Sequence, residues 1–209
     1  MKKILIIDPF IKQPVNNCFN RLVDLLPAKL YLFQPAFFPQ QLYALPTVDA
    51  YIILGSASHV FENLPWQNSL SHFLISELKN GKPVLGLCFG HQLICHHFGA
   101  QVKFVHDDEQ KISGSREIAL DNLVFELGVT HRQAVMSLSA DLKAHGSPHA
   151  LLGYDLISHK TLPFLGAQSH PEASDQFLRD ECGINDYTVR QKILSSSSEF
   201  LKHWYKTYL

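Results

Sequence analysis

Short, wholly apolar runs alternate with amphipathic segments over the first half of the chain. Such runs occur at 3–7, 49–54 and 84–87, and turn-forming or small residues follow each of them. Runs of this length are typical of strands buried on both faces of a parallel sheet. Residues 29–33 are a further candidate strand. The pattern therefore predicts an α/β fold with a parallel sheet and right-handed crossovers.

Helical spacing separates these runs. Residues 17–26 carry apolar side chains at helical intervals, and a short helix is expected at 40–44 in a proline-rich stretch. Residues 66–80 form an amphipathic pattern that ends just before Gly81. Another helix is expected after the strand at 84–87, and it should stop at Gly99.

The second half of the chain has a different pattern. Shorter β-like runs at 101–105, 117–120, 133–136, 149–154 and 162–168 are separated by turn residues, which predicts antiparallel strands or hairpins added to the parallel core. After Pro171 the pattern becomes helical, and a terminal helix is expected at 187–205. The sequence contains no internal repeat and no linker, so we expect one domain over 1–209.

Composition narrows the class of protein. The 209 residues are 46% hydrophobic, and 18 basic residues against 19 acidic ones give a net charge of −1. This balance favours neither nucleic acid nor an anionic membrane as a partner. The first apolar run stops at Asp8-Pro9, too early for a signal peptide, and the four cysteines lack the spacing of a disulfide scaffold. We therefore expect a cytoplasmic location.

Residues 84–92 carry the first candidate chemistry. A buried strand ends at Leu87, the chain turns sharply at Cys88, and a helix is expected to begin near His91. This is the layout of a nucleophile elbow, in which glycines such as Gly86 and Gly90 permit a tight turn. A helix N-terminus would activate the thiol and stabilise an oxyanion. The alternative is that Cys88 is an ordinary buried thiol.

A second candidate element lies at 165–172, where a strand runs into a His-Pro-Glu turn. A thiol nucleophile needs a base, which His170 could provide, and Glu172 could fix the tautomer of that base. His170 is far from Cys88 in the chain, so only the fold can bring them together. Taken alone, the same residues could form a solvated surface turn. Taken together, the two elements favour nucleophilic catalysis.

These two motifs resemble those of the class I (triad) glutamine amidotransferases, and most of all the stand-alone proteins similar to the glutaminase domain of GMP synthase. The likeness covers nearly the whole chain. It rests on Gly-Leu-Cys-Phe-Gly-His-Gln at 86–92 and Gln-Ser-His-Pro-Glu at 168–172, with support from 55–60, the helix of Trp66, 114–117 and 130–135. The resemblance implies a flavodoxin-like open, mostly parallel sheet with flanking helices and added antiparallel strands.

The resemblance also implies an activity. Cys88 would attack the side-chain amide of glutamine to form a thioester, His170 would shuttle the proton, and Glu172 would orient His170. Ammonia would pass to a partner synthase or synthetase, and no cofactor is implied. Backbone N–H groups would form the oxyanion site, and a second set of residues would hold the substrate. The oxyanion residues implied are Gly55, Ser56 and Phe89, and the substrate-binding ones are Gln92, His131, Arg132 and Gln133.

The chain departs from the family pattern in two places. The oxyanion loop reads Gly55-Ser56-Ala57 where the family usually has Gly-Gly-Pro, and Arg132-Gln133 stands where glycine and aspartate are common. The arginine could block the pocket or select an acidic or γ-glutamyl substrate. Two alternatives follow: a γ-glutamyl hydrolase or peptidase acting on a larger compound, and a non-catalytic regulatory protein of the same fold.

The chain contains 12 histidines, and several of them lie near a cysteine. His91, Cys95, His96 and His97 are close in sequence, but a zinc site needs three or four converging ligands and no second cluster is visible. We therefore expect no metal site, and we interpret His91 as a residue that supports the elbow.

Overall fold

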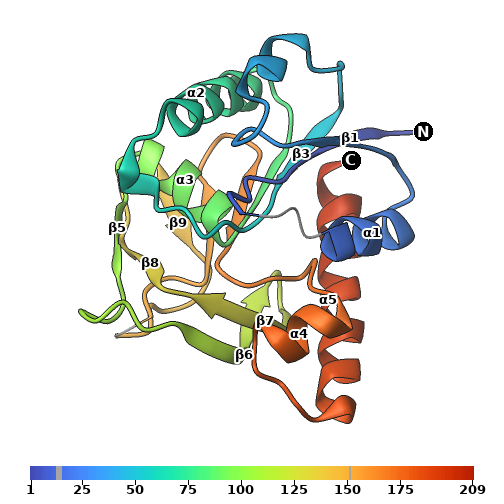
Figure 1. The fold of residues 1–209 in the computed structure, drawn as a ribbon, viewed down its shortest axis with the longest axis vertical. Coiled ribbons are helices and arrows are strands. Elements are labelled where there is room, and N and C mark those ends of the chain that lie inside the picture. Colours follow the sequence, from blue (N-terminus) through green and yellow to red (C-terminus); the bar gives the residue numbers. More distant parts are fainter. Residues whose placement is uncertain (13–15, 151) are drawn as a thin grey trace.

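The computed structural model describes residues 1–12, 16–150 and 152–209. Its centre is a seven-stranded sheet in the order β2-β1-β3-β4-β11-β10-β9 (Figure 1). The first five strands of this order are parallel to one another, and β10 runs antiparallel to both of its neighbours. The strands are β1 (Lys3–Ile7), β2 (Lys29–Phe33), β3 (Ala50–Ile53), β4 (Val84–Leu87), β9 (Leu142–Ala144), β10 (Leu156–His159) and β11 (Phe164–Ala167). The predicted α/β fold with a mostly parallel sheet is confirmed.

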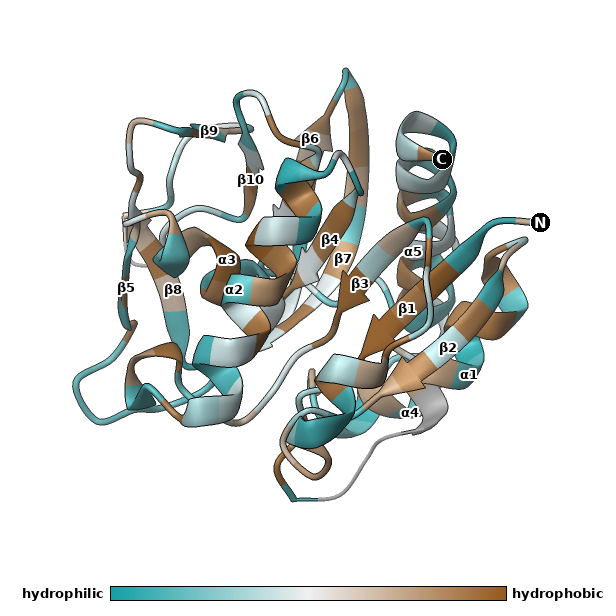
Figure 2. Ribbon diagram, turned by 90° about the horizontal axis from the view of Figure 1, so that it is seen from above, coloured by the Kyte–Doolittle hydropathy of each residue, from teal (hydrophilic) through white to brown (hydrophobic). Residues whose placement is uncertain are grey.

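Helices cover both faces of this sheet (Figures 1 and 2). On one face lie α2 and α3, and on the other lie α1 and the long α5. The helices are α1 (Asn16–Leu25), α2 (Pro65–Lys79), α3 (Phe89–His97), α4 (Asp175–Asp180) and α5 (Tyr187–Tyr208), with 3₁₀ turns η1 (Pro39–Ala44) and η2 (Val60–Glu62).

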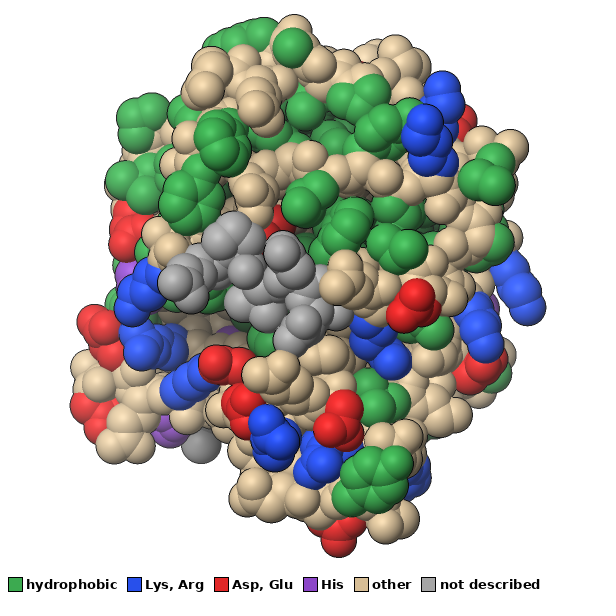
Figure 3. Space-filling model, turned by 45° about the vertical axis from the view of Figure 1, so that its right-hand side comes forward, with side chains coloured by type: hydrophobic (Ala, Val, Ile, Leu, Met, Phe, Trp, Pro, Cys, Tyr) green, Lys and Arg blue, Asp and Glu red, His purple; other side chains and the backbone are tan. Residues whose placement is uncertain are grey.

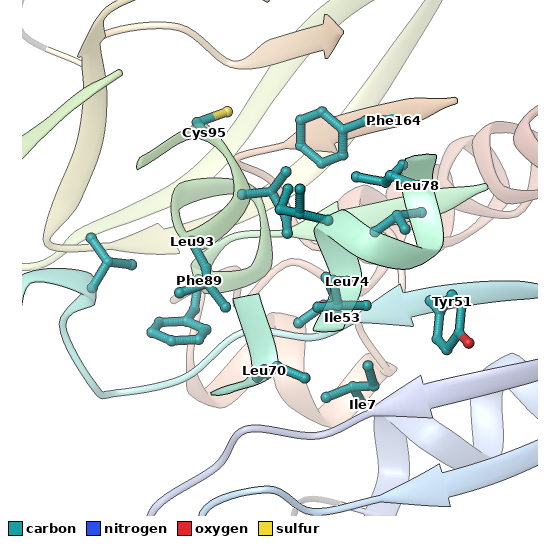
Figure 4. Packing of buried hydrophobic residues seen from close by; sticks show 14 of the residues in the cluster. Ile7, Tyr51, Ile53, Leu70, Leu74, Leu78, Phe89, Leu93, Cys95 and Phe164 are labelled. Carbon is teal, nitrogen blue, oxygen red and sulfur yellow. The ribbon is translucent and has the colours of Figure 1, made fainter. Parts of the chain in front are cut away.

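Side chains of the central strands alternate between two apolar layers. In β1, Leu5 and Ile7 pack with α2 and α3, whereas Ile4 and Ile6 pack on the side of α1 and α5. Figure 4 shows the first layer, with Phe89 and Leu93 of α3 beside Leu70 and Leu74 of α2 and Ile53 of β3. Because both faces are covered, these strands read as continuous apolar runs in the sequence.

Two further antiparallel pairs lie beside the main sheet. The first joins β5 (Gln101–Phe104) to β8 (Gln133–Ser137), and the second joins β6 (Ile112–Leu120) to β7 (Leu123–His131). The hairpin of β6 and β7 packs on α5 through buried side chains such as Ile118 and Phe125. The predicted hairpin additions are therefore confirmed in kind, although β7 was not predicted.

Two expectations from the second half of the chain need correction. The run at 162–168 forms β11, which is parallel to β4 within the central sheet, not an antiparallel addition. The run at 149–154 includes residue 151, which lies outside the described residues, and its described part has one isolated bridge, between His149 and Gly153. The predicted helical region after Pro171 is confirmed as α4 and α5, and α5 extends three residues beyond the predicted end, to Tyr208. Along 1–12, 16–150 and 152–209, no helix is both long and apolar enough to cross a membrane.

Candidate active site

Cys88 occupies a tight turn between β4 and α3. Its backbone has φ 48° and ψ −102°, a region that L-residues rarely adopt. A Cβ on Gly86 would lie 2.7 Å from the carbonyl carbon of Gly90, and a Cβ on Gly90 would lie 2.6 Å from the Ile53 oxygen. Both glycines are therefore required by close backbone contacts. The helix begins at Phe89, two residues before the predicted His91, so the elbow is tighter than expected.

The neighbouring strand brings His170 to this turn. Ala167 of β11 is in register with Leu87 of β4, so the two chain segments leave the sheet side by side. The His170 backbone N–H donates to the Gly128 carbonyl at 2.8 Å. Its ring Nδ1 lies 2.8 Å from Oε1 of Glu172, and both side chains are buried. The His-Pro-Glu segment is thus a buried hydrogen-bonded pair and not a solvated turn.

Cys88 and His170 share two neighbours, the Thr130 carbonyl and Gly55. The Thr130 carbonyl oxygen lies 3.8 Å from Cys88 Sγ and 3.4 Å from His170 Nε2. A Cβ added to Gly55 would lie 2.8 Å from His170 Cε1 and 3.5 Å from Cys88 Cβ. The structure therefore brings together Cys88, His170 and Glu172, which the sequence predicted as a triad.

Two opposing effects act on the pKa of His170. Burial disfavours a charged imidazole, but Glu172 and the sulfur of Cys88 outweigh it, so that the pKa of His170 is raised well above its ordinary value. The Phe177 ring packs against His170 with centroids 4.9 Å apart. In contrast, burial lowers the pKa of nearby His131 to about 4. The pKa values of the two histidines are therefore shifted in opposite directions.

Burial acts strongly on the other three thiols of the chain. It raises the pKa of Cys18 to about 12, that of Cys182 to about 11, and that of Cys95 well above its ordinary value. These three cysteines remain protonated at neutral pH, and a thiolate is the reactive form of the side chain. A thiol reagent should therefore react slowly with Cys18, Cys95 and Cys182.

The residues predicted to hold an oxyanion lie around Cys88. Phe89 opens α3, and the N–H groups of a first helical turn have no intrahelical acceptor. Gly55 and Ser56 follow β3 and line the same cavity as Cys88. The Ser56 hydroxyl donates to the Pro9 carbonyl at 2.7 Å and accepts from the Ser58 N–H at 3.1 Å. Phe89 and the Gly55-Ser56 turn thus lie beside Cys88, and their role as an oxyanion site stays a prediction.

Gln67 of α2 anchors the loop that follows Gly55, and sequence reasoning missed it. Its side chain is 1% exposed, and its amide nitrogen donates to Ser58 Oγ at 2.8 Å and to the His59 carbonyl at 3.0 Å. Its oxygen accepts from the Leu64 N–H at 3.0 Å. Glu62 adds contacts to the Ser58 hydroxyl and the His59 N–H. The available signal was Gln67 three residues after Leu64, with Pro65 between them, a helix-capping spacing.

The four predicted substrate-binding residues gather on the β8 side of the elbow. Gln92 is buried, and its amide nitrogen donates to the Gln133 carbonyl at 2.7 Å and to Gln168 Oε1 at 3.0 Å. His131 Nδ1 contacts the same Gln133 carbonyl at 2.9 Å, and Arg132 is exposed. None of the four lines the cavity that holds Cys88. Their role in substrate binding stays a prediction.

That cavity has a volume of about 500 Å³, which is in the range of small-molecule sites. It runs from the elbow toward the loop after β1 and toward α4. The lining residues are Asp8, Phe10, Lys12, Cys18, Leu54, Gly55, Ser56, Ala57, Cys88, Lys111, Thr130, His170, Glu172, Ser174, Gln176, Phe177, Asp180 and Glu181.

His91 lies under the elbow. It is fully buried, its Nδ1 lies 3.9 Å from Cys95 Sγ, and burial lowers its pKa to about 3. A Cβ on Gly166 of β11 would come within 2.5 Å of that nitrogen. His91 therefore packs α3 tightly against the sheet. In the described part of the chain, no group of three histidines, cysteines or acids could hold a metal ion.

Comparisons with known proteins show the family of the chain. The family model described as glutamine amidotransferase class-I matches residues 16–182. A subunit of the glutamine-hydrolyzing GMP synthase of Methanospirillum hungatei is 30% identical over 135 residues, which are 60% of this chain and 65% of that protein. The corresponding subunit from Thermoplasma acidophilum is 30% identical over 145 residues, which are 65% of this chain and 70% of that protein.

More distant matches are shorter or structural. The carbamoyl phosphate synthase small chain of Desulfovibrio desulfuricans is 34% identical over 109 residues, and the match spans 48% of this chain and 27% of that one. A crystal structure of a putative GMP synthase subunit from T. acidophilum has a TM-score of 0.67 at 21% identity, over 97% of both chains. Several curated relatives are thus matched over less than two thirds of their length. Since the family model spans most of the chain, including Cys88 and His170, the chain belongs to the class I glutamine amidotransferases.

Proposed function

We propose that this chain hydrolyses the side-chain amide of glutamine through Cys88, His170 and Glu172, and that it supplies the ammonia to a partner synthase. The observation that carries the proposal is the position of His170. One ring nitrogen lies 2.8 Å from Glu172, and the other shares the Thr130 carbonyl with Cys88 Sγ. A base held between an orienting carboxylate and a thiol is what nucleophilic catalysis requires.

The proposed reaction has two halves. The Cys88 thiol gives its proton to His170 as its sulfur bonds to the amide carbon, and His170 passes that proton to the nitrogen as the C–N bond breaks and ammonia leaves. A water molecule then gives a proton to His170 and attacks the thioester, which releases glutamate and restores the thiol. Glu172 keeps the His170 ring in one orientation through both halves.

The tetrahedral intermediates need donors for their negative oxygen. The N–H of Phe89 and those of the Gly55-Ser56 turn flank Cys88, so they are the proposed oxyanion site. No step of this chemistry needs a metal or an organic cofactor. The Gln67 anchor supports the proposal, because a loop that must present N–H groups to a reacting oxygen has to be held in place.

A partner is proposed because the matched proteins carry the names of parts of larger synthases. They include two GMP synthase subunits, a carbamoyl phosphate synthase small chain and component 2 of the anthranilate synthase of Haemophilus influenzae. The rival proposal, a regulatory protein without turnover, gives no reason for a cysteine at φ 48° beside a buried His-Glu pair.

The proposal is tested by intact mass after incubation with an electrophilic glutamine analogue. We expect one adduct on the native chain, protection by excess glutamine and no adduct on Cys88→Ala. Cys182→Ala is the matched control, because Cys182 is a buried, protonated thiol and its loss should leave labelling unchanged. If iodoacetamide modifies Cys88 but the analogue does not, the pocket rejects glutamine and the proposal fails.

A further inference from the structure

The position of His170 fixes where a leaving group must go. In the proposed hydrolysis, His170 gives its proton to the amide nitrogen, so that nitrogen must come within hydrogen-bond reach of the imidazole. Any substituent on the nitrogen then extends past His170 and away from Cys88. Glutamine carries only hydrogen there and needs no space beyond the ring.

The cavity that holds Cys88 also reaches α4 beside His170, where Phe177 packs against the imidazole. On that side it is walled by α4 and the segment after it, which contribute Phe177, Asp180 and Glu181, and by Lys111 before β6. The Ser113 hydroxyl donates to the Glu181 carbonyl at 3.2 Å, so β6 and the end of α4 close this wall. We call the part of the cavity lined by Lys111, Ser174, Phe177, Asp180 and Glu181 the leaving-group pocket.

Most of the acidic groups in the cavity are already engaged. Glu172 binds His170, Asp180 accepts from Arg179 at 2.7 Å, and Glu181 lies 2.6 Å from the Lys111 ammonium. Asp8 is buried and accepts from the Phe10 N–H at 3.2 Å, and burial raises its pKa.

The two lysines that line the cavity, Lys12 and Lys111, are less fully engaged in ion pairs. None of the ion pairs among the described residues involves Lys12, which lines the cavity. The Lys111–Glu181 pair is 39% and 50% exposed at its two side chains, and exposed pairs of this kind contribute little stability. Lys111 can therefore turn toward an incoming carboxylate at small cost. On the face shown in Figure 3, basic and acidic side chains lie interspersed, without a field of one sign.

We propose that the leaving-group pocket binds the amine portion of an N-substituted γ-glutamyl amide whose substituent carries a carboxylate, such as a γ-glutamyl amino acid. Phe177 contacts the body of the substituent, and Lys111 pairs with its carboxylate. The inference rests on the proposed function, since it uses the same thiol and the same proton transfer.

The chemistry balances without another reactant. The Cys88 sulfur bonds to the γ-carbonyl carbon, the C–N bond breaks, and the proton from His170 leaves on the amino acid. Water then hydrolyses the thioester to glutamate.

The test compares three substrates on the whole chain. γ-Glutamylglycine has the carboxylate, γ-glutamylglycinamide lacks its charge, and glutamine lacks the substituent. We expect the native chain to release glycine from γ-glutamylglycine with a kcat/KM about tenfold above that for γ-glutamylglycinamide, as one charged hydrogen bond implies. This preference should fall toward one in Lys111→Met. It should rise in Glu181→Gln, which removes the carboxylate that competes for Lys111.

Lys192→Met is the matched control, because Lys192 is 71% exposed, pairs with Glu126 and does not line the cavity. Its preference should equal that of the native chain. Hydrolysis of glutamine without hydrolysis of either substituted amide overturns this inference and leaves the proposed function standing. Equal kcat/KM values for the two substituted amides in the native chain overturn the proposed pairing of Lys111 with the carboxylate of the substituent. No release of ammonia or glycine from any of the three compounds overturns both proposals.

Discussion

The anchor formed by Gln67 gives the sharpest prediction about catalysis. The substitution Gln67→Leu keeps the approximate size of the side chain but removes three hydrogen bonds, to Ser58 Oγ, the His59 carbonyl and the Leu64 N–H. The Ser58 hydroxyl keeps Glu62 as a partner. Two backbone groups therefore lose their buried partner. At ~1–1.5 kcal/mol each, the expected loss in free energy of unfolding is ~2–3 kcal/mol.

The effect on the reaction should be larger than the effect on stability. Ser58 and His59 close the loop that begins at Gly55, and releasing them displaces the N–H groups of the proposed oxyanion site. Removing one such donor costs about 10²–10³-fold in kcat in other enzymes, and we expect a loss of that order here. Alkylation of Cys88 by iodoacetamide forms no oxyanion, so its rate should change less than twofold.

The assay is a comparison of these two rates in one preparation, with urea unfolding as the measure of stability. Gln191→Leu is the matched control, because Gln191 is exposed on α5 and its substitution should change none of the three quantities. A parallel fall in turnover and in alkylation would refute the reasoning, since it would show that Gln67 maintains the whole site and not the oxyanion loop.

Three further predictions concern the residues around Cys88. Glu172→Gln should lower the kcat for glutamine by about 10³–10⁴-fold with little change in KM, because His170 loses the carboxylate that fixes its tautomer. Steady-state kinetics measure this effect. A loss of tenfold or less would show that Glu172 is not part of the triad. Gly55→Ala places a Cβ 2.8 Å from His170 Cε1, so it should cost ~1–3 kcal/mol of stability and most of the activity, as urea unfolding and kinetics would show; native activity in this variant would contradict the geometry. Burial lowers the pKa of His91 to about 3 and that of His131 to about 4, both below the ordinary 6.5. Through these two groups the unfolded chain binds more protons in acid, and each should remove ~1.4 kcal/mol of stability per pH unit as the pH falls below about 6.5. The pKa of His170 is raised, so His170 acts in the opposite sense and offsets the effect of about one of them. Urea unfolding at pH 7.5 and 5.5 measures the slope, and a stability that does not change between them would be inconsistent with two buried neutral histidines.

The elbow could be predicted because its determinants are local. Gly86 and Gly90 bracket Cys88 in sequence, and the backbone contacts that require them are made within the same turn or with the adjacent strand. The pairing of Cys88 with His170 was predicted from complementary chemistry. Its physical basis, the parallel register of β4 and β11, could not be predicted, because the run at 162–168 resembles the hairpin strands before it.

Other features left weaker signals. The strand β7 was not predicted because Glu126, Gly128 and Thr130 interrupt its apolar residues. Its extended backbone is held by the antiparallel pairing with β6. Gln67 reads as a polar surface position on an amphipathic helix, although it is buried against the Ser58 loop. The leaving-group pocket depends on where α4 packs, and a six-residue helix leaves almost no periodic signal.

The backbone of Cys88 has a consequence for how such a chain would evolve. A residue with a side chain at φ 48° and ψ −102° costs about 1–3 kcal/mol, and glycine would remove most of that cost. Under the proposed function, the cysteine side chain at this position is kept at a cost to the stability of the fold. A relative that keeps the fold without turnover gains stability by placing glycine at position 88, so we expect glycine there in such proteins.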